Sequence, residues 1–528
     1  MELQIADLFE SVATAVPQRE ALVVRTGTAT RRWTYAELAA RVDRAAGALA
    51  ALGVGVGDRV GLHLRNGPTY LEAMLGAFAL RAVPVNLNYR YVAEELAYVV
   101  GDAELSVVVT EPDTADVVHG VAAAADRPVT VIVDGDPWEQ ALASADPAAA
   151  RVTGRSADDL YLLYTGGTTG FPKGVMWRHE DIYFASLGGR GTPSRGIGPV
   201  RSPHEVAERA VAGDPITRRL PLCPLMHGGA MWVALQTHLN GGCLVLSGDR
   251  HFTASAALDL MADEAVELVM LIGDATARPI ADALDAEPDR WDLRALQVIA
   301  SGGAVLSPSV TARLRRRLAG VTVADTFGAS ETGGQGRLRA GEPGEPPRLI
   351  TDADTAVLDD DGRPLPPGSD QVGRLARTGH IPLGYLNDPD KTAATFPIID
   401  GRRWSVPGDL ARLEADGTVV VLGRGALCIN TGGEKVFPEE VERVLKQHPA
   451  VADALVVGVP HDRLGQQVAA VVAARPGATL TVDALEAVAR EHLAGYKVPR
   501  TWRFEPSCRR LPTGKGDYRW AAEVLATS

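Results

Sequence analysis

The sequence predicts an α/β protein in which a large domain of stacked sheets precedes a small α+β domain. Helical periodicity over Tyr35–Leu52 and Thr69–Leu80 alternates with short apolar runs, as in parallel or mixed sheets covered by helices. The 528 residues exceed the usual size of one domain and can supply a sizeable core. The apolar runs expected to form early strands are Arg59–Leu64, Leu105–Thr110 and Val129–Val133.

The pattern changes near Arg424, where the small α+β unit is expected to begin. We therefore predict one domain over residues 1–424 and a second over residues 425–528. The elements expected in the second domain are the helices Glu439–Gln447 and Val482–Leu493 and the strands Ala454–Val459 and Gln467–Ala473.

One stretch of the large domain lacks periodicity. Residues Ser186–Asp214 are dense in Gly, Pro and Arg, without the spacing of a helix or a strand. We expect a long surface excursion near the mouth of the active site, or a partly disordered segment.

Composition and charge exclude several classes of protein. The hydrophobic fraction is 46% and the charged fraction 23%, and no apolar stretch reaches the roughly 18 residues of a membrane span. A net charge of −13, with both signs interspersed, predicts no nucleic-acid or membrane partner. The acidic, amphipathic N-terminus is unlike a signal peptide. Cys223, Cys243, Cys428 and Cys508 form no CxxC pair, which indicates neither a zinc site nor disulfides and predicts a cytoplasmic location.

Residues 164–175, YTGGTTGFPKGV, predict a phosphate-binding loop. The apolar run Leu160–Tyr164 reads as a buried strand that leads into it. Glycines let the backbone close around an anion, and successive N–H groups then form a nest for phosphate. The motif is not a Walker loop, because Phe-Pro precedes the lysine; the alternative is a flexible surface loop. The residues predicted to bind the phosphates are Thr165, Gly166, Gly167, Thr168, Thr169, Gly170 and Lys173.

The loop resembles the phosphate-binding signature of the adenylate-forming enzymes, which include acyl-CoA synthetases, luciferases and peptide-synthetase adenylation domains. The family usually has Ser where this chain has Gly167. The resemblance implies ATP or AMP, Mg²⁺ and coenzyme A as ligands. It also implies a small distorted barrel in the large domain and a mobile C-terminal domain.

A second motif, DTFGASET at residues 325–332, is similar to the family's aromatic-Gly-x-Thr-Glu segment. An aromatic face at Phe327 would stack on adenine, and Glu331 with Thr165 would hold Mg²⁺, which accepts one carboxylate plus substrate phosphates. The alternative for Glu331 is a solvated loop carboxylate. The resemblance assigns the nucleotide to Gly302, Gly303 and Ala304 and to Asp325, Thr326, Phe327, Gly328, Ala329 and Ser330.

The remaining motifs lie toward the C-terminus. By resemblance, Asp409 would accept the ribose hydroxyls, Arg424 would reach the nucleotide, and Gly432 and Gly433 would line the path of the pantetheine arm. Lys515 resembles the family's catalytic lysine. The alternatives are an Asp in a Pro-Gly turn and a solvated surface Lys.

Two departures from the family accompany these motifs. Pro407 stands where the family has Thr beside the ribose carboxylate. Ala426 and Leu427 stand where it carries an ionic hinge residue. The missing ionic residue predicts either a hinge at another position or a different balance between the two domain arrangements.

The segment Pro224–Gly229 resembles the part of the family that gates the acyl pocket. We predict His227, Gly228, Met231, Gly273, Asp274 and Gly302 as substrate-binding residues. His227 could instead be incidental at a helix start, and Asp274 could be a helix N-cap. Lys515, Glu331, Thr165 and His227 are the predicted catalytic residues.

Within the family, the chain looks most like actinobacterial acyl-CoA synthetases that activate steroid side-chain acids, on the motifs at residues 165–183, 273–279, 429–442 and 495–500. The resemblance implies ligation of a bulky polycyclic acid to CoA through an acyl-adenylate. Alternatives are a medium- or long-chain fatty acyl-CoA synthetase, an enzyme specialised for CoA transfer, and a luciferase-like oxygenase. A peptide-synthetase module and a non-enzymatic binder are disfavoured. A homodimer is possible, and the pathway, catabolic or biosynthetic, stays open.

Overall fold

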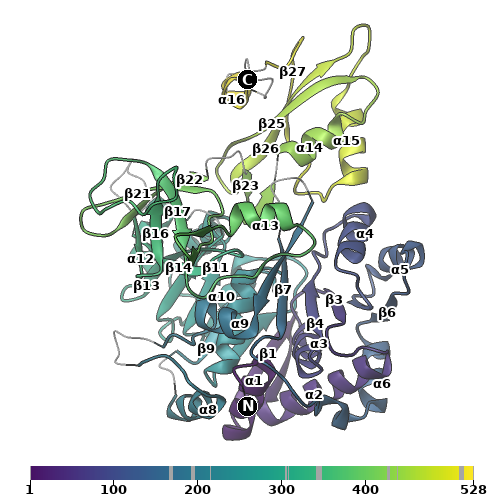
Figure 1. Ribbon diagram of the computed structural model, residues 1–528, viewed down its shortest axis with the longest axis vertical. Coiled ribbons are helices and arrows are strands. Elements are labelled where there is room, and N and C mark those ends of the chain that lie inside the picture. Colours follow the sequence, from purple (N-terminus) through teal and green to yellow (C-terminus); the bar gives the residue numbers. More distant parts are fainter. Residues whose placement is uncertain are drawn as a thin grey trace.

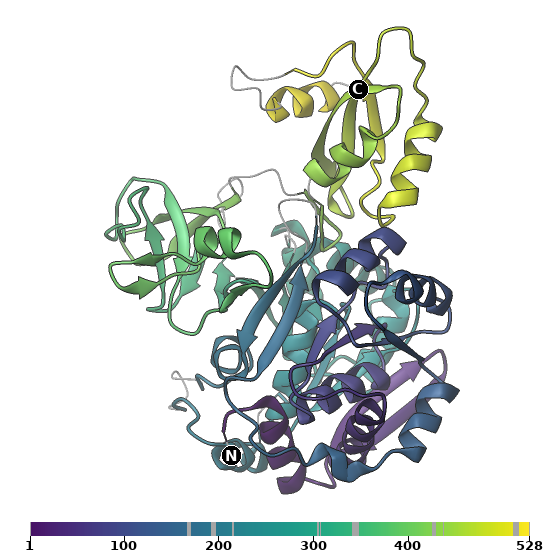
Figure 2. The ribbon, with the colours of Figure 1, turned by 45° about the vertical axis from the view of Figure 1, so that its right-hand side comes forward.

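The computed structural model describes residues 2–165, 171–191, 197–213, 216–303, 306, 308–339, 348–424, 429–436, 438–509 and 517–526. Figures 1 and 2 show a large lower body, a smaller β unit beside it (green) and a separate C-terminal unit above both (yellow). The predicted α/β fold with a small C-terminal unit is confirmed. The boundary at Arg424 stays a prediction, because residues 425–428 lie outside the description.

The first sheet of the large body has seven strands among the described residues, in the order β18-β8-β7-β4-β3-β5-β6. Its central strands are parallel, whereas β8 runs antiparallel to β7 and to β18. The strands are β3 (Arg59–His63), β4 (Val83–Asn86), β5 (Val107–Thr110), β6 (Thr130–Val133), β7 (Leu160–Thr165), β8 (Lys173–Arg178) and β18 (Gly384–Tyr385).

The second sheet has thirteen strands among the described residues, in the order β16-β17-β21-β22-β15-β14-β13-β12-β11-β9-β10-β1-β2. Strands β1, β10, β9, β11, β12 and β13 are parallel neighbours, and the antiparallel strands from β14 onward form the smaller β unit. The strands are β1 (Glu20–Thr26), β2 (Ala29–Thr34), β9 (Arg218–Pro221), β10 (Cys243–Ser247), β11 (Leu268–Leu271), β12 (Val298–Ser301), β13 (Thr322–Ala329), β14 (Gly333–Arg339), β15 (Arg348–Thr351), β16 (Thr355–Leu358), β17 (Gly373–Arg377), β21 (Asp409–Leu413) and β22 (Val419–Arg424). A separate two-stranded ribbon joins β19 (Ile398–Ile399) and β20 (Arg402–Arg403).

The C-terminal unit is built on a third sheet, in which β27 pairs with β26 beside the path β24-β23-β26-β25. Two apolar clusters lie within this unit and are separate from those of the large body. Its elements are β23 (Ile429–Thr431), β24 (Glu434–Val436), α14 (Pro438–Leu445), β25 (Val451–His461), β26 (Gly465–Ala474), α15 (Val482–His492), β27 (Thr501–Phe504) and α16 (Tyr518–Ala526).

The helices of the large body follow local signals in the sequence. The α2 helix begins with a capping box in which Thr34 and Glu37 satisfy each other's backbone N–H groups, and α3 has Pro68 in its first turn. Helices α1, α2, α3 and α9 share one apolar cluster with residues of both sheets, which forms the main core. The helices are α1 (Ile5–Ala15), α2 (Tyr35–Ala51), α3 (Pro68–Ala79), α4 (Ala93–Asp102), α5 (Ala115–Ala124), α6 (Asp136–Ser144), the short 3₁₀ helix Pro147–Ala150, α7 (His179–Ser186), α8 (Pro203–Ala212), α9 (Gly228–Leu239), α10 (Ala254–Asp263), α11 (Gly273–Ala286), α12 (Pro308–Arg317) and α13 (Pro389–Thr395). In the part of the chain described, no helix combines the length and apolarity that crossing a membrane requires.

The stretch Ser186–Asp214 contains a helix, so the prediction of an irregular excursion is wrong for its second half. The α8 helix begins after Ser202, whose Oγ accepts a hydrogen bond from the Glu205 N–H at 3.3 Å. Pro203 occupies the first turn, where its missing N–H costs nothing. The Ser-Pro-x-Glu pattern is a helix-start signal that the lack of longer periodicity concealed.

Candidate active site

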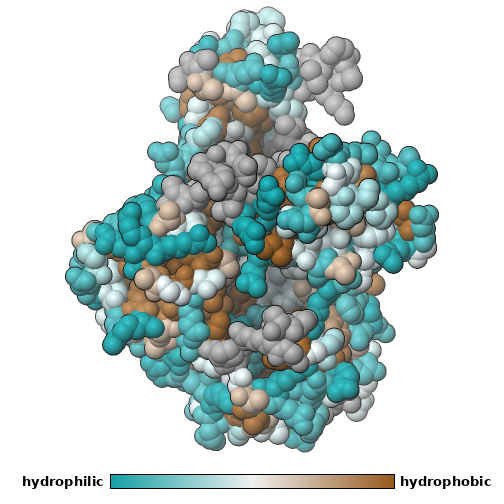
Figure 3. Space-filling view, turned by 90° about the vertical axis from the view of Figure 1, so that its left-hand side faces the viewer, coloured by the Kyte–Doolittle hydropathy of each residue, from teal (hydrophilic) through white to brown (hydrophobic). Residues whose placement is uncertain are grey.

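A cavity of about 650 Å³ opens at the carboxyl ends of the parallel strands of the second sheet. The face shown in Figure 3 is hollowed, with apolar residues gathered around the hollow. Because side chains alternate along a strand, every second residue of three neighbouring strands faces the cavity. These residues are Leu268, Met270 and Ile272 at β11, Val298, Ala300 and Gly302 at β12, and Ala324, Thr326 and Gly328 on β13.

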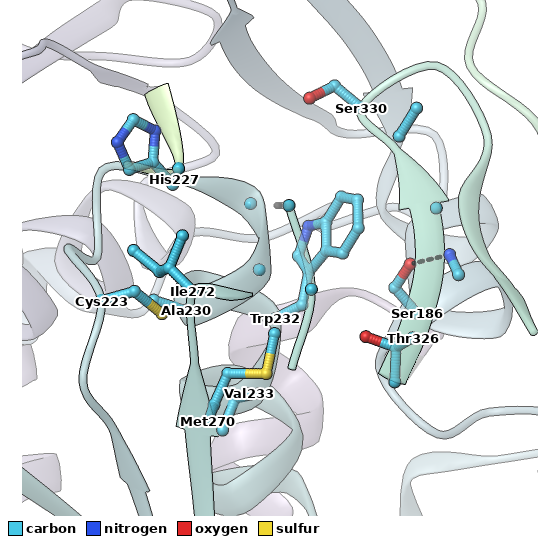
Figure 4. A pocket seen from close by; sticks show the side chains of 18 of the residues that line it. Ser186, Cys223, His227, Ala230, Trp232, Val233, Met270, Ile272, Thr326 and Ser330 are labelled. Atoms are coloured by element: carbon cyan, nitrogen blue, oxygen red, sulfur yellow. Dashed lines mark hydrogen bonds between the residues drawn. The ribbon is translucent and has the colours of Figure 1, made fainter. Parts of the chain in front are cut away.

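The opposite wall is one face of α9, which His227 precedes as its N-cap residue (Figure 4). The cavity-lining residues recur at helical spacing, and Trp232 and Val233 lie one turn below the entrance. Met231 is buried in the core cluster and is not among the residues that line the cavity, so the structure does not place it on the cavity wall. The lining residues of α9 are Gly228, Gly229, Ala230, Trp232, Val233 and Gln236.

Asn86, at the end of β4, holds two predicted segments together beside the cavity. Its carboxamide donates to the carbonyls of Tyr164 at 2.9 Å and Met226 at 2.7 Å, and accepts from the Tyr164 N–H at 2.7 Å. Tyr164 precedes the predicted phosphate loop and Met226 precedes His227. One buried amide thereby fixes the spacing between the loop and the entrance of the acyl cavity.

The hairpin of β13 and β14 forms a third wall with Phe327, Ala329 and Ser330. Its backbone is held from both sides, because Trp177 Nε1 donates to the Ser330 carbonyl at 2.9 Å and Ser405 Oγ donates to the Glu331 carbonyl at 2.6 Å. A Cβ on Gly328 would lie 2.4 Å from the Gly333 carbonyl oxygen, so no larger residue fits there.

The Glu331 side chain meets a group of polar residues at the end of the phosphate loop. Its Oε1 accepts a hydrogen bond from the Tyr385 hydroxyl at 3.0 Å, and Lys173 Nζ lies 5.6 Å from the centre of the Tyr385 ring. Lys173 also pairs with Asp388, which lowers the pKa of that carboxyl despite the opposing effect of burial. Thr165 and Lys173 are register partners in β7 and β8, so both ends of the predicted loop are fixed side by side.

Asp409, predicted to accept the ribose hydroxyls, and Arg424, predicted to reach the nucleotide, are neighbours. Asp409 begins β21, is buried, and pairs in register with Arg424 of the antiparallel strand β22. The Arg424 side chain lies outside the description. No sequence pattern indicated that these two residues are register partners on neighbouring antiparallel strands.

The C-terminal unit closes over the cavity entrance with the turn between β23 and β24. Gly432 and Gly433 have φ angles of +58° and +89°, and a Cβ on Gly433 would lie 2.0 Å from Ile272 Cγ2. Glu434 Oε1 lies 3.1 Å from His227 Nε2 and 2.5 Å from Arg90 Nη1. Burial raises the pKa of the Glu434 carboxyl, but His227, Arg90 and nearby Lys497 together bring it below its ordinary value.

A buried ion cluster fastens the same unit to α4, which lies directly beneath it in Figure 1. Lys497 Nζ lies 2.5 Å from Glu95 Oε1 of the large body and 2.7 Å from Glu440 Oε1 of its own unit. Burial lowers the pKa of Lys497, but the two carboxylates outweigh it and the net pKa is raised. An outer pair, His492 with Glu94 at 2.7 Å, lies nearby.

A family model described as AMP-binding enzyme matches residues 9–386, and one described as AMP-binding enzyme C-terminal domain matches residues 440–515. The chain belongs to the AMP-binding enzyme family. Membership implies use of ATP or AMP and of CoA, and the predicted resemblance to adenylate-forming enzymes is confirmed.

Three relatives of this AMP-binding enzyme span nearly its whole length. A 3-oxocholest-4-en-26-oate–CoA ligase of Rhodococcus rhodochrous is 44% identical over 542 residues, covering 99% of this chain and 96% of the relative. A medium/long-chain-fatty-acid–CoA/3-oxocholest-4-en-26-oate–CoA ligase of Mycobacterium tuberculosis is 44% identical over 540 residues, with the same coverages. The structure of amide bond synthetase McbA from Marinactinospora thermotolerans matches with a TM-score of 0.79 at 25% identity, covering 98% of this chain and 99% of that one. The predicted likeness to steroid-acid CoA ligases of actinobacteria is therefore confirmed.

Several predicted site residues of this family member lie outside the described part of the chain. They are Gly166, Gly167, Thr168, Thr169, Gly170, Ala304 and Lys515, together with the Asp274 side chain and the hinge positions Ala426 and Leu427. Gly273, a predicted substrate residue, is buried and is not among the residues that line the cavity; its N–H donates to Ser301 Oγ at 3.1 Å. The α11 helix begins at Gly273 with Ile272 as its N-cap residue, so the alternative of Asp274 as N-cap is wrong.

The sequence analysis missed several residues that build the site. Tyr385 is not among the predicted site residues, yet its hydroxyl contacts Glu331. Trp232, Val233 and Gln236 could have been found from helical spacing after Gly228, and strand alternation could have found Met270. No local signal marked Asn86, and Lys497 stood out only as part of the motif at residues 495–500, without a role, because the partners of both residues lie far away in the chain.

Proposed function

We propose that this AMP-binding enzyme is an AMP-forming acyl-CoA ligase that activates a bulky polycyclic carboxylic acid. The observation that carries the proposal is the shape of the cavity. The small residues Ala300, Gly302 and Ala324 leave room along one wall, and Trp232 and Val233 line the opposite wall from α9. A cavity of about 650 Å³ with this mainly apolar middle has room for fused rings. The names of two relatives, which are steroid-acid CoA ligases, support the same class of substrate.

The first half-reaction needs no protein nucleophile, because a carboxylate is already ionised at neutral pH and attacks the α-phosphorus of ATP as pyrophosphate leaves. The protein positions the reactants and neutralises developing charge. Lys173 and the loop that starts at Thr165 would hold the phosphates, Asp409 would accept the ribose hydroxyls, and Lys515 would contact the carboxylate and the α-phosphate oxygens. These roles are proposals from the family resemblance.

The Glu331 carboxylate fits a magnesium site, because Tyr385 occupies one carboxylate oxygen and orients the group beside Thr165 and Lys173. Mg²⁺ takes few protein ligands and keeps waters or phosphate oxygens. When bound by Glu331 and Thr165, it would neutralise phosphate charge.

In the second half-reaction the CoA thiol attacks the acyl-adenylate and AMP leaves. We propose that the arrangement described here serves this step, because Gly432 and Gly433 lie at the cavity entrance, where a pantetheine arm would pass. Arg509 and Asp517, which flank the lysine loop, pair with each other at 3.2 Å and line no part of the cavity. Rotation of the small unit would exchange the two arrangements.

The test is a panel of carboxylic acids with ATP, Mg²⁺ and CoA, read by the mass of the thioester. Polycyclic acids should exceed palmitate in kcat/KM. A preference for long straight chains would overturn the proposed substrate class and favour the second candidate, a medium- or long-chain fatty acyl-CoA synthetase, which the name of the Mycobacterium tuberculosis relative supports.

A cytoplasmic location and a homodimer remain predictions. Cell fractionation would test the location, and light scattering would test the oligomeric state.

A specialised CoA-transfer enzyme is the other alternative from the sequence, since Gly167 and Pro407 each replace a hydroxyl residue of the family. Losing a hydrogen bond to a charged phosphate costs about 1.5–3 kcal/mol. Acid-dependent exchange of labelled pyrophosphate into ATP, at a rate matching CoA capture of a synthetic acyl-adenylate, would exclude this alternative and leave a complete ligase.

A further inference from the structure

The floor of the cavity is polar, whereas its middle is apolar. Strand register places Arg219 of β9 beside Leu268, which in turn pairs with Val298, and all three line the cavity. Two residues further along the strands the lining residues are Met270 and Ala300. Arg219 thus lies at the end of the cavity away from the adenylate motifs.

Gln236 reaches the same floor from α9. It stands eight residues after Gly228 at the entrance, which is about 12 Å along the helix axis at 1.5 Å per residue. Arg219 Nη1 donates to Gln236 Oε1 at 2.7 Å, so the two walls meet there. The floor therefore lies at the depth that the ring end of a substrate would occupy when its carboxylate is at the entrance.

The contact with Arg219 fixes which way the Gln236 carboxamide points. A guanidinium has only donors, so the amide oxygen must face Arg219 and the NH₂ group must face away. No described residue accepts a hydrogen bond from Gln236 Nε2, and this nitrogen is not among the fully enclosed polar atoms. Gln236 Nε2 is therefore a neutral hydrogen-bond donor on the floor of the cavity, and the contact with Arg219 holds its orientation.

We propose that Gln236 Nε2 donates a hydrogen bond to a carbonyl oxygen on the ring end of the substrate, remote from the carboxylate. Gln236 is then a specificity-determining residue and Arg219 its positioning residue. The substrate class narrows from polycyclic acids to oxo-polycyclic acids. A hydrocarbon ring end would strip water from this donor without replacing the lost hydrogen bond. The inference rests on the proposed function.

The experiment compares two steroid acids that differ only in a ring ketone at the end remote from the carboxylate, with kcat/KM measured for thioester formation. Wild type should prefer the ketone roughly tenfold, the size of one hydrogen bond. Gln236→Glu keeps an acceptor for Arg219 and the same shape but removes the donor, so the preference should vanish or reverse. Gln371→Glu, the same change on an exposed loop, should keep it.

A third acid with a hydroxyl in place of the ketone separates carbonyl recognition from general polarity, and the ketone should exceed it. Equal rates for the ketone and its deoxy partner in wild type would overturn the inference and leave the ligase proposal intact. A ketone preference that persists in Gln236→Glu would also overturn it. Activity on palmitate but on none of the steroid acids would overturn the proposed substrate class and the inference together.

Discussion

Replacing Gly433 by Ala should obstruct CoA transfer while sparing adenylate formation. The added Cβ would lie 2.0 Å from Ile272 Cγ2 in the arrangement described here, whereas carbon atoms in contact are about 3.5–4.0 Å apart. One side must therefore shift by roughly 1.5–2 Å. Forcing a methyl group into a packed contact costs about 1–3 kcal/mol. That cost applies only while the small unit lies on the large body.

A matched control separates this clash from backbone strain. Gly432 also has a positive φ, but a Cβ there would meet only Leu464 of the same unit, at 3.1 Å. Both Ala variants therefore carry the strain of a left-handed residue, and only Gly433→Ala clashes across the interface. The docked population should fall by roughly 5- to 150-fold more in Gly433→Ala, since 1.4 kcal/mol is a factor of ten.

The assay is CoA capture of a synthetic acyl-adenylate, run beside pyrophosphate exchange. CoA capture should fall in Gly433→Ala well beyond its fall in Gly432→Ala, with exchange equal in the two. Truncation of the opposing side chain, Ile272→Ala in the Gly433→Ala background, should restore part of the lost rate. Equal loss of CoA capture in the two glycine variants would refute the reasoning, as would an exchange rate that falls in parallel.

Three further predictions concern charged groups. Lys515→Ala should lower adenylate formation by roughly 10²–10³-fold and leave CoA capture within about threefold, and near-normal exchange would exclude the assignment. Glu95→Gln removes a buried partner of Lys497 at a cost of about 3 kcal/mol and should slow CoA capture, whereas Glu94→Gln at the outer pair should cost less than about 1 kcal/mol. The lowered pKa of Glu434 means that its stabilising contribution is complete above its ordinary pKa of 4.5 and is lost as pH falls through the lower folded value. Without substrates, energy transfer between labels on the two units should therefore report a docked fraction that stays constant above pH 4.5 and falls in acid below it, and a docked fraction that already falls between neutrality and pH 4.5 would count against the Glu434 contacts.

The sequence by itself determined the fold class, the family and the order of the motifs, because these depend on short-range chemistry. Glycines at the phosphate loop, the Thr34–Glu37 capping box and the apolar run Arg59–Leu64 are each legible within a few residues. The same local reading failed at α8, where a short helix follows an irregular segment. It also failed at Met231, which is buried in the core cluster and does not line the cavity.

Only the tertiary structure decided what forms the acyl cavity and what holds the small unit. The sheet order puts β9 beside β11 and β11 beside β12, so Arg219 and Val298 share a floor although they are far apart in the chain. The contact of Gln236 with Arg219, and that of Lys497 with Glu95, likewise join distant segments. Side-chain pairing across strands and units depends on register and docking, which no local pattern encodes.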